Sequence, residues 1–491
     1  MPNGHPNILF ITTDQQRGDA LGIAGQSWLQ TPSLDTLAHE GYYLSRCYSE
    51  APVCVAARTT WMTGQHPWVH GVLSNQVNPM NPATTLPGVL TRHGYRTHGA
   101  GKMHFTPDQR ALNGFQSVII CEEGRMRDGD DYHHWLQQTP WAGLERGHGV
   151  GNNDIFAAPS PIPESHYVST WTANESIQFL QQHQTEDPQQ PFFLHCSFTK
   201  PHSAYDPPRP YDQLYGPGDV PTPVRNGTDM PESPPQLQLA HHAYTWDALG
   251  PEQIALARAF YYGNITHLDH CIGRVLGTLD SLNIRNDTLI VFNSDHGDLM
   301  GDHNLFFKSN YYEESTHVPL IVWAPEIVRD RLALGANRTV HSLVGQRQLM
   351  PFMLAAAEAP IPDGIDDRPL ADIIAGRHPG EAVHGVFGDQ ANRQLALIEE
   401  RFKYIWWANG QFEQLFDRDT DPGELTNLAG NPAFENERVR LRERLADTVR
   451  KHGGHEALDG NELRGTTYDA SSTRFGWFGD KIKPPWGRRP Y

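Results

Sequence analysis

The chain has 491 residues, of which 38% are hydrophobic and 20% charged, so a wholly disordered protein is excluded. Its 57 acidic residues against 39 Lys and Arg give a formal net charge of −18, which disfavours a protein that coats nucleic acid. No apolar run reaches the ~18 residues of a membrane span, and residues 1–6 lack the basic flank and apolar core of a signal peptide. We therefore predict a cytoplasmic protein without a membrane partner.

Three short apolar runs, at residues 7–11, 191–198 and 288–292, each end in polar side chains capable of chemistry. Continuous apolar runs are typical of strands buried on both faces, as in a parallel sheet covered by helices. Ligands bind at the carboxyl edge of such sheets. The residues expected at this edge are Asp14, Gln15, Lys200, His202, Asp295 and His296. The sequence thus predicts an α/β fold with a site at one edge of its sheet.

Helical patterns lie between these runs. Residues 31–37 begin a predicted helix, with Thr31 as the expected N-cap and Pro32 in the first turn. Residues 252–282 repeat apolar side chains every three or four positions, which predicts a long amphipathic helix. Nine prolines between residues 206 and 235 predict a loop that runs over the surface.

The pattern changes near residue 380, where short strands and a charged helix predict a small antiparallel α+β subdomain. The strands are expected at residues 383–388, 395–399 and 404–408, and the helix at 435–450. We divide the chain into an α/β domain at residues 1–378, which carries the predicted sheet-edge site, a C-terminal α+β subdomain at 379–465 and an arm at 466–491.

The arm is basic and aromatic: residues 474–491 carry five basic residues against one acid, and five aromatic rings. An extended segment cannot bury its own rings, so it must pack on its own core or on a neighbouring molecule. We predict a homo-oligomer in which the arm crosses onto another subunit. An arm folded back on its own subunit is the alternative.

Two residue pairs at the predicted sheet edge have the side chains of metal ligands. Asp14 with Gln15, and Asp295 with His296, offer carboxylate oxygens, an amide oxygen and an imidazole. These groups suit Ca²⁺, Mn²⁺ or Mg²⁺ better than a thiolate zinc site. Either pair alone is also consistent with a helix cap or a loop anchor, but the set predicts a divalent-cation site.

A cysteine opens another predicted helix. Arg58 follows Cys54 by four residues and therefore lies on the same helix face. A helix N-terminus and a guanidinium group both stabilise an anion. Because free cysteines are among the most buried residues, a structural role for Cys54 is the alternative. The five cysteines are scattered and show neither a zinc spacing nor a disulfide framework, so we expect reduced thiols.

The run from Cys54 to Arg58, with Thr59, Thr60, Thr63 and Gly64 after it, resembles the signature of the sulfatase family in the alkaline-phosphatase superfamily. Further segments match the motifs of this family in the usual order between residues 6 and 428. They are residues 7–15 with Arg17, 101–104, 200–202, 294–298, Lys308 with 311–314 and 317–320, and 414–428. The resemblance implies a large mixed, mostly parallel sheet sandwiched by helices, with a smaller C-terminal antiparallel α+β subdomain.

The resemblance also implies the chemistry. A maturation enzyme would oxidise Cys54 to formylglycine, and one hydroxyl of its hydrated aldehyde would attack the sulfur of a sulfate monoester. The other hydroxyl would then collapse to the aldehyde and expel sulfate. The substrate would be a sulfated sugar or a small aryl or alkyl sulfate. The metal would be held by Asp14, Gln15, Asp295, His296 and the modified Cys54.

The remaining roles follow from the same resemblance. Arg58 would hold the diol and the metal shell, and Lys102 and Lys308 would contact the sulfate oxygens. His202 is the expected general acid for the leaving alcohol, and His104 the expected base for collapse of the diol. Asn75 is a candidate for contacting the ester. Lys200 we expect to be solvated.

Three positions depart from the usual pattern of the family. Ala56 replaces the proline of the signature, Gln15 replaces a second Asp, and His296 replaces an Asn. Gln15 removes a negative charge and His296 adds a nitrogen donor, but Ca²⁺ is still favoured over Mn²⁺, with Mg²⁺ as a further alternative. The same changes resemble the phosphonate monoester and phosphodiester hydrolases of the superfamily, which are the alternative function. Lys102 and His104 favour sulfate, because the phosphonate enzymes tend to carry uncharged groups there.

A further alternative is a non-catalytic anion-binding homologue in which Cys54 is unmodified. Whichever function holds, specificity in such a cleft comes from loops outside the anion pocket. The expected loops are residues 121–167, with Trp135 and Trp141, and the proline-rich segment. Their aromatic rings would either stack on a sugar or pack on the surface.

Overall fold

The structure is a computed structural model. It describes residues 4–76, 80–122, 129–225, 230, 232–244, 246–336, 338–365, 370–389 and 392–470. Residues 471–491 of the predicted arm lie outside this part, so the exchanged arm and the homo-oligomer stay predictions. Among the helices of the described part, none combines the length and the apolar character needed to cross a membrane.

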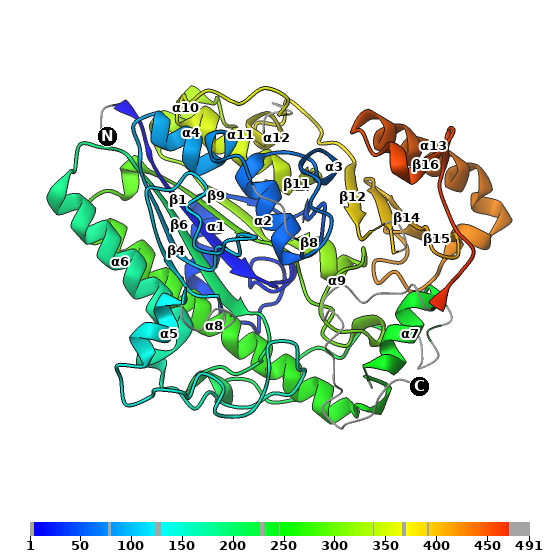
Figure 1. Cartoon of the computed structure of the whole chain (residues 1–491), viewed down its shortest axis with the longest axis horizontal. Helices are drawn as coiled ribbons and strands as arrows, with labels where there is room; N and C mark the ends of the chain where they lie inside the picture. The colour runs from blue at the N-terminus through cyan, green and yellow to red at the C-terminus, as the bar shows by residue number, and fades with distance from the viewer. Residues whose placement is uncertain are drawn as a thin grey trace.

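A mixed sheet runs through the centre of the molecule (Figure 1). In the described residues it has eight strands in the order β10-β2-β9-β7-β1-β6-β4-β5. In chain order these are β1 (Asn7–Asp14), β2 (Tyr42–Leu44), β4 (Arg96–Gly101), β5 (Ser117–Ile120), β6 (Phe192–Pro201), β7 (Thr288–Ser294), β9 (Leu320–Trp323) and β10 (Thr339–Val340). Of these, β9 runs antiparallel to both of its neighbours, and the other pairings are parallel. The predicted fold class is thus confirmed.

Both faces of the central strand β1 are buried, as its continuous apolar run predicts. Ile8 and Phe10 belong to one hydrophobic cluster, while Leu9 and Ile11 belong to another. Because successive side chains of a strand point to opposite faces, each cluster lies on its own side of the sheet. Both sides are therefore covered by helices.

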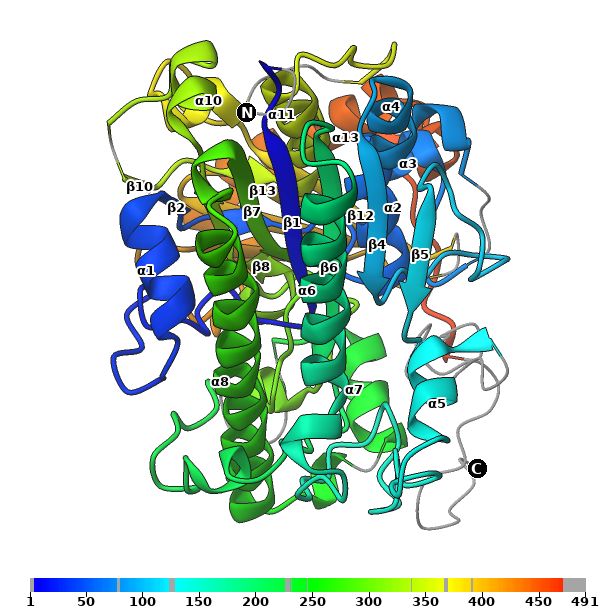
Figure 2. The same ribbon diagram turned by 90° about the vertical axis from the view of Figure 1, so that its left-hand side faces the viewer.

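Helices α1, α6 and α8 pack on the Leu9 face, where α6 and α8 lie side by side across the sheet (Figure 2). Helices α2, α4 and α11 pack on the Ile8 face. Their bounds are α1 (Pro32–Glu40), α2 (Cys54–Thr63), α4 (Leu86–Arg92), α6 (Val168–Glu186), α8 (Pro251–Ser281) and α11 (Leu349–Ala356). The predicted long helix at residues 252–282 corresponds to α8, shifted by one residue.

Shorter elements complete the α/β part of the chain. The helices are α3 (Pro67–His70), α5 (Asp131–Leu136), α7 (Pro235–Ala243), α9 (Glu313–Thr316), α10 (Glu326–Arg331) and α12 (Leu370–Ile374). A small sheet joins β3 (Cys47–Tyr48), β8 (His317–Val318) and β11 (Val344–Gly345).

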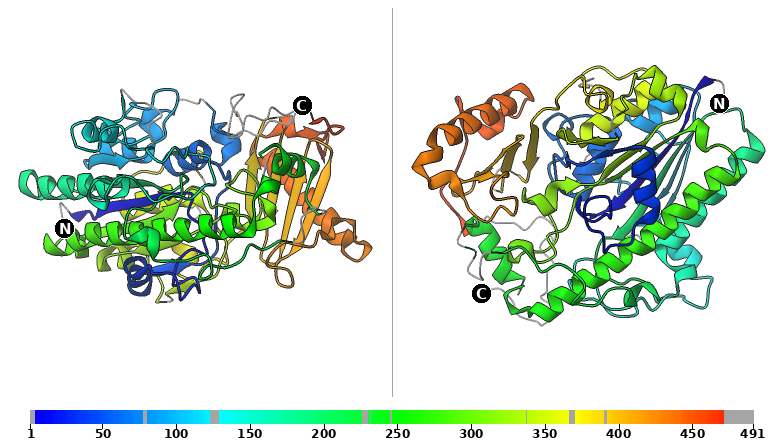
Figure 3. Two further views of the ribbon diagram at one scale, coloured as in Figure 1. Left: turned by 90° about the horizontal axis from the view of Figure 1, so that it is seen from below. Right: turned by 180° about the vertical axis from the view of Figure 1, so that it is seen from behind.

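A separate antiparallel sheet lies at one end of the molecule and is covered by a helix (Figure 3). Its strands are β12 (Val383–Phe387), β13 (Gln394–Ile398), β14 (Phe402–Trp407) and β15 (Phe412–Asp417), and the helix is α13 (Glu435–Lys451). A hairpin of β16 (Leu458–Asp459) and β17 (Glu462–Leu463) follows. The predicted C-terminal α+β subdomain is confirmed, although β15 was expected only as a motif. The boundary at residue 379 stays a prediction.

Parallel strands bring the predicted site to one edge of the main sheet. In the register of the sheet, Thr13 lies opposite Ser294, Asp14 lies opposite Pro201, and Gly101 lies opposite Ser197. The segments that follow β1, β4, β6 and β7 therefore meet at the same edge.

Candidate active site

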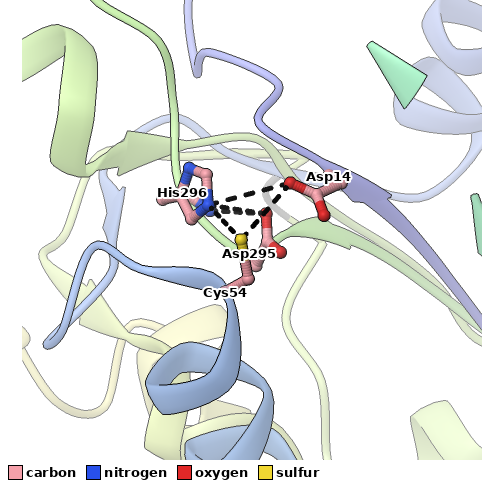
Figure 4. Close-up of side chains that lie close together, drawn as sticks. All are labelled: Asp14, Cys54, Asp295 and His296. Carbon is pink, nitrogen blue, oxygen red and sulfur yellow. Dashed lines mark hydrogen bonds and ion pairs between the residues drawn. The ribbon is translucent and has the colours of Figure 1, made fainter. Parts of the chain in front are cut away.

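Four buried side chains converge at this edge: Asp14, Cys54, Asp295 and His296 (Figure 4). Their nearest ligand atoms all lie within 4.8 Å of one another. The Sγ of Cys54 is 3.2 Å from Nε2 of His296 and 3.8 Å from Oδ1 of Asp14. Residues far apart in the sequence are thus brought together at the ends of β1 and β7 and at the start of α2.

The ring of His296 is oriented by its own backbone turn. Its Nδ1 donates to the carbonyl oxygen of Gly297 at 2.9 Å, so the lone pair of the neutral ring is on Nε2. That nitrogen is 3.7 Å from a carboxylate oxygen of Asp14 and 3.7 Å from one of Asp295. Two carboxylates and an imidazole lone pair therefore face one point, which is a donor set that fits a hard or borderline divalent cation.

Gln15 lies beside this group in a left-handed backbone conformation, with φ of 71°. Its backbone N–H donates to Oδ1 of Asp295 at 2.9 Å. Its side-chain amide donates to Oδ2 of Asp298 at 2.5 Å, and its Oε1 accepts from Nζ of Lys308 at 2.5 Å. Because Asp298 accepts from the amide NH₂ of Gln15, the oxygen Oε1 is the atom that faces Lys308 and the site. The sequence signal for Asp298 was its place in the 294–298 motif.

Cys54 is the first residue of α2, as the sequence predicts, and it is 1% exposed. Burial and Asp14 act to raise the pKa of its thiol, but positive groups outweigh them and lower it. These groups are Lys308, Lys102 and, when its ring is protonated, His296. The thiol position therefore lies in a positive environment at a helix N-terminus.

Asn75 contacts the first turn of the same helix. Its Oδ1 accepts the backbone N–H of Val55 at 3.1 Å, while the residue itself is exposed. This bond satisfies one of the backbone N–H groups in the first turn of α2 that have no partner within the helix. The predicted contact of Asn75 with an ester would use its remaining amide N–H groups.

Arg58 lies one turn further along α2 and connects both acidic residues. Its Nε donates to Oδ2 of Asp295 at 2.9 Å, and its Nη2 is 3.5 Å from Oδ2 of Asp14. Its Nη1 donates to the carbonyl oxygen of Lys102 at 2.7 Å and to Oγ of Ser197 at 2.9 Å. The guanidinium therefore fixes the positions of the two carboxylates.

Two buried lysines flank the acidic residues. Nζ of Lys102 forms an ion pair with Oδ2 of Asp14, and Lys308 is 3% exposed. Burial alone would raise the pKa of the Asp14 carboxyl, but four positive groups hold it well below its usual range. These are Lys102, the His202 ring when it is protonated, Arg58 and Lys308.

The two predicted acid–base histidines follow β6 and β4. Nδ1 of His202 donates to the carbonyl oxygen of Ser203 at 2.7 Å, which leaves Nε2 facing Nζ of Lys308 at 2.9 Å. His104 has a left-handed backbone, with φ of 56°, and is buried. The backbone N–H of His104 donates to Oε1 of Glu122 at 2.6 Å. Glu122 was not predicted, because nothing in its local sequence marks it.

The segment before Cys54 is held by distant parts of the chain. The carbonyl oxygen of Glu50 accepts from the N–H of Val386 in β12 and from the hydroxyl of Tyr311, both at 3.0 Å. The Glu50 carboxylate accepts the N–H of Gln346 at 2.9 Å. The side chain of Gln346 in turn donates to Oδ1 of Asn293 at 2.9 Å. The Cys54 loop, the end of β7 and the C-terminal subdomain are therefore joined.

The sulfatase family model matches residues 6–359, which is more than half of the chain. The chain belongs to the sulfatase family. A second family model, described as N-sulphoglucosamine sulphohydrolase, C-terminal, matches residues 301–451. Membership of the sulfatase family makes the chain an enzyme of the sulfuric ester hydrolase class.

Individual sulfatases and related enzymes are similar over nearly the whole chain. An arylsulfatase of Clostridium perfringens is 33% identical over 486 residues, covering 93% of this chain and 97% of that protein. A choline-sulfatase of Rhizobium meliloti is 30% identical, covering 94% and 89%. The crystal structure of a phosphonate monoester hydrolase of Agrobacterium radiobacter superposes with a TM-score of 0.79 at 26% identity, covering 91% and 96%.

Proposed function

We propose that this protein hydrolyses sulfate monoesters with a formylglycine formed from Cys54. The observation that carries the proposal is the position of Cys54, at the first turn of α2 and within 4.8 Å of Asp14, Asp295 and His296. A formylglycine supplies its hydrated aldehyde as the nucleophile. Arg58, one helical turn away, would hold that side chain toward the acidic residues.

We further propose one divalent cation, held by Asp14, Asp295, His296, the Oε1 of Gln15 and the formylglycine formed from Cys54. The fit rests on the carboxylates and the Nε2 lone pair that face one point. Such a cation lowers the pKa of a bound hydroxyl and neutralises sulfate oxygens. Oxygen-rich ligands favour Ca²⁺, with Mn²⁺ or Mg²⁺ as alternatives.

The side-chain charges suit an anionic substrate. Three cations, Arg58, Lys102 and Lys308, are buried beside two carboxylates, Asp14 and Asp295. These three cations exceed the two carboxylates by one charge, while Asp298 and Glu122 bond to the Gln15 amide and to the backbone N–H of His104. Fixed positive charge in a dry site stabilises the charge that develops on the sulfate oxygens in the transition state.

The protonation steps are assigned to the two histidines. His202, once protonated at Nε2, donates that proton to the leaving oxygen as the sulfur–oxygen bond breaks. His104 takes the proton whose loss regenerates the aldehyde. The carboxylate of Glu122 accepts the backbone N–H of His104 and so holds the turn that carries this histidine.

The decisive experiment combines mass spectrometry and an activity assay after co-expression with a formylglycine-generating enzyme. The peptide that contains residue 54 should weigh ~18 Da less than the thiol form. The same preparation should release 4-nitrophenol from 4-nitrophenyl sulfate. An unmodified peptide in a folded protein that binds sulfate would instead support a non-catalytic anion-binding homologue.

A phosphonate monoester or phosphodiester hydrolase is the second candidate. The TM-score of 0.79 to a phosphonate monoester hydrolase supports it. The buried Lys102, which pairs with Asp14, favours the sulfate ester, because the phosphonate enzymes tend to carry an uncharged group at this position. Comparing kcat/KM for 4-nitrophenyl sulfate and for a phenyl phosphonate monoester separates the two. Faster cleavage of the phosphonate would make phosphonate monoester hydrolysis the first candidate function and sulfate ester hydrolysis the second.

The leaving group is proposed to be a small aryl or alkyl alcohol or a sugar. The two relatives above are an arylsulfatase and a choline-sulfatase. The ring of Trp135 packs against Tyr132 and His166, with centroids at 6.0 and 5.3 Å, and Trp141 is 6.5 Å from His166. Of the two roles expected for these tryptophans, the contacts support surface packing.

A further inference from the structure

Lys200, which was expected to be solvated, is buried. Its side chain is 10% exposed, and its ammonium group is fully occupied by protein acceptors. Nζ donates to Oδ1 of Asp206 at 2.5 Å and to the carbonyl oxygens of Ala204 at 2.7 Å and His202 at 3.3 Å. A sulfate oxygen would have to displace one of these bonds, so we do not assign Lys200 to the substrate.

Asp206 is the centre of this arrangement. Besides Lys200, its Oδ1 accepts from the hydroxyl of Tyr167 at 2.9 Å. Its Oδ2 accepts from Nε2 of His148 at 3.0 Å, since Nδ1 of that ring accepts the N–H of Val150. Burial acts to raise the pKa of Asp206, but Lys200 and His148 outweigh it and lower the pKa. We refer to Lys200, Asp206, Tyr167 and His148 as the Asp206 cluster.

The Asp206 cluster connects the turn at residues 200–206 to rigid parts of the fold. Tyr167 directly precedes α6, and its hydroxyl is also 3.0 Å from Oδ1 of Asn264 in α8. These two helices cover the sheet face opposite α2. The turn that carries His202 is thereby tied to the helices through one carboxylate.

The direction of the His202 ring depends on that turn. Nδ1 of His202 donates to the carbonyl oxygen of Ser203, and Lys200 donates to the carbonyl oxygens on either side of Ser203. If the turn relaxes, the acceptor of Nδ1 moves and Nε2 moves with it. General acid catalysis requires the donor within hydrogen-bond reach of the leaving oxygen.

We propose that Asp206, acting through Lys200, is a positioning residue for His202. The inference rests on the proposed function, in which His202 protonates the leaving oxygen. Asp206 touches neither the metal ligands nor Lys308 in the contacts described, and its effect is confined to the placement of the proton donor.

The leaving group of the substrate provides the test. A 4-nitrophenolate leaves as a stable anion and needs little protonation, whereas phenol, with a pKa near the ~10 of tyrosine, needs much more. In the matured, metal-loaded enzyme, Asp206→Asn should lower kcat for phenyl sulfate about a hundredfold and for 4-nitrophenyl sulfate less than about tenfold. Equal losses for both esters, or no loss for either, would overturn the proposal.

Two further variants keep the test decisive. Tyr167→Phe removes a single bond to the same carboxylate and should change the ratio of the two rates in the same direction, by about threefold. Where Asp206→Asn does not fold, the ratio in Tyr167→Phe decides, and an unchanged ratio overturns the inference. Asp219→Asn, at an exposed aspartate in the same proline-rich segment, is the matched control and should leave both rates unchanged.

The proposed function is tested separately in the same assay. Hydrolysis of 4-nitrophenyl sulfate by the wild-type enzyme requires the formylglycine and the metal but depends little on the Asp206 cluster, because its leaving group needs little protonation. A wild type without sulfatase activity contradicts the function, whereas an active wild type with an unchanged ratio in the variants contradicts only this inference.

Discussion

Nζ of Lys308 lies 2.9 Å from Nε2 of His202 and 2.5 Å from Oε1 of Gln15, so one ammonium group connects the expected proton donor to an expected metal ligand. In the proposed function, the same group contacts the sulfate oxygens and stabilises the negative charge that develops on them. Lys308 is therefore the cation whose removal should disturb catalysis most directly.

Substituting Lys308 by Ala should lower kcat for 4-nitrophenyl sulfate about a hundredfold, because a fixed charge beside the transferred group is lost. The fold should be retained, as circular dichroism would show. Lys451→Ala, at an exposed position of α13, is the control and should leave kcat unchanged. Near-normal turnover of Lys308→Ala would contradict the role assigned to it.

Replacing Ala56 by Pro should raise the fraction of chains that carry formylglycine. Ala56 is the third residue of α2, where backbone N–H groups have no partner within the helix, so proline fits the first turn. Intact-peptide mass spectrometry on protein from cells with limiting maturation enzyme would measure the fraction. Cys54→Ala, which cannot be converted, gives the baseline, and an unchanged fraction would contradict the prediction.

Replacing His296 by Asn should shift the metal preference toward Ca²⁺. The imidazole Nε2 is the nitrogen ligand of the proposed set, and Mn²⁺ accepts nitrogen ligands more readily than Ca²⁺ does. We expect the Kd for Mn²⁺ to rise about tenfold while that for Ca²⁺ changes less. Titration calorimetry on the metal-free protein measures both; unchanged Kd values for the two ions would exclude His296 from the ligands, and equal increases would contradict the predicted shift in preference.

Glu50 should make the free energy of unfolding depend on pH. Burial raises the pKa of its carboxyl from 4.5 to about 7. Between these values the unfolded chain is ionised at Glu50 while the folded chain keeps the proton, so stability falls as pH rises from about 4.5 to about 7. The total is about 3 kcal/mol. Above pH 7 both states are ionised and this contribution becomes constant.

Glu50→Gln removes this titration, so urea unfolding of wild type and variant across that pH range gives the contribution of Glu50 as a difference. Buried His70, His267 and His384, whose pKa values burial lowers to about 3, act in the opposite direction in both proteins and cancel. Glu326→Gln, at an exposed glutamate, is the control. Parallel pH profiles for wild type and Glu50→Gln would contradict the prediction.

The sequence predicted the sheet edge and the residues on it because the signals are local. An apolar run that ends in Asp14 or in Asp295 marks both a buried strand and its end. Cys54 and Arg58 are separated by one helical turn, so their shared face follows from spacing. The order of motifs then identified the family that the chain was found to belong to.

The supporting residues could not be predicted, because their partners are distant in the sequence. Lysine side chains usually lie on the surface. Lys200 is buried because the turn at residues 200–206 places Asp206 and two carbonyl oxygens around its ammonium group. Glu122 bonds to the backbone of His104 across two strands, which no local pattern marks. Strand β15 was not predicted as a strand because Glu413 and Gln414 interrupt its apolar run.

The burial of Cys54 determines when its thiol is accessible during synthesis and folding of the chain. The finished fold encloses its Sγ, and the bond from Val386 to Glu50 is made by a strand synthesised more than three hundred residues later. At about 5–20 residues per second, a ribosome needs about 20 s to a minute for that length. Under the proposed function, conversion of the Cys54 thiol should therefore be most efficient during this interval, before β12 is made, and slower translation should raise the fraction of converted chains.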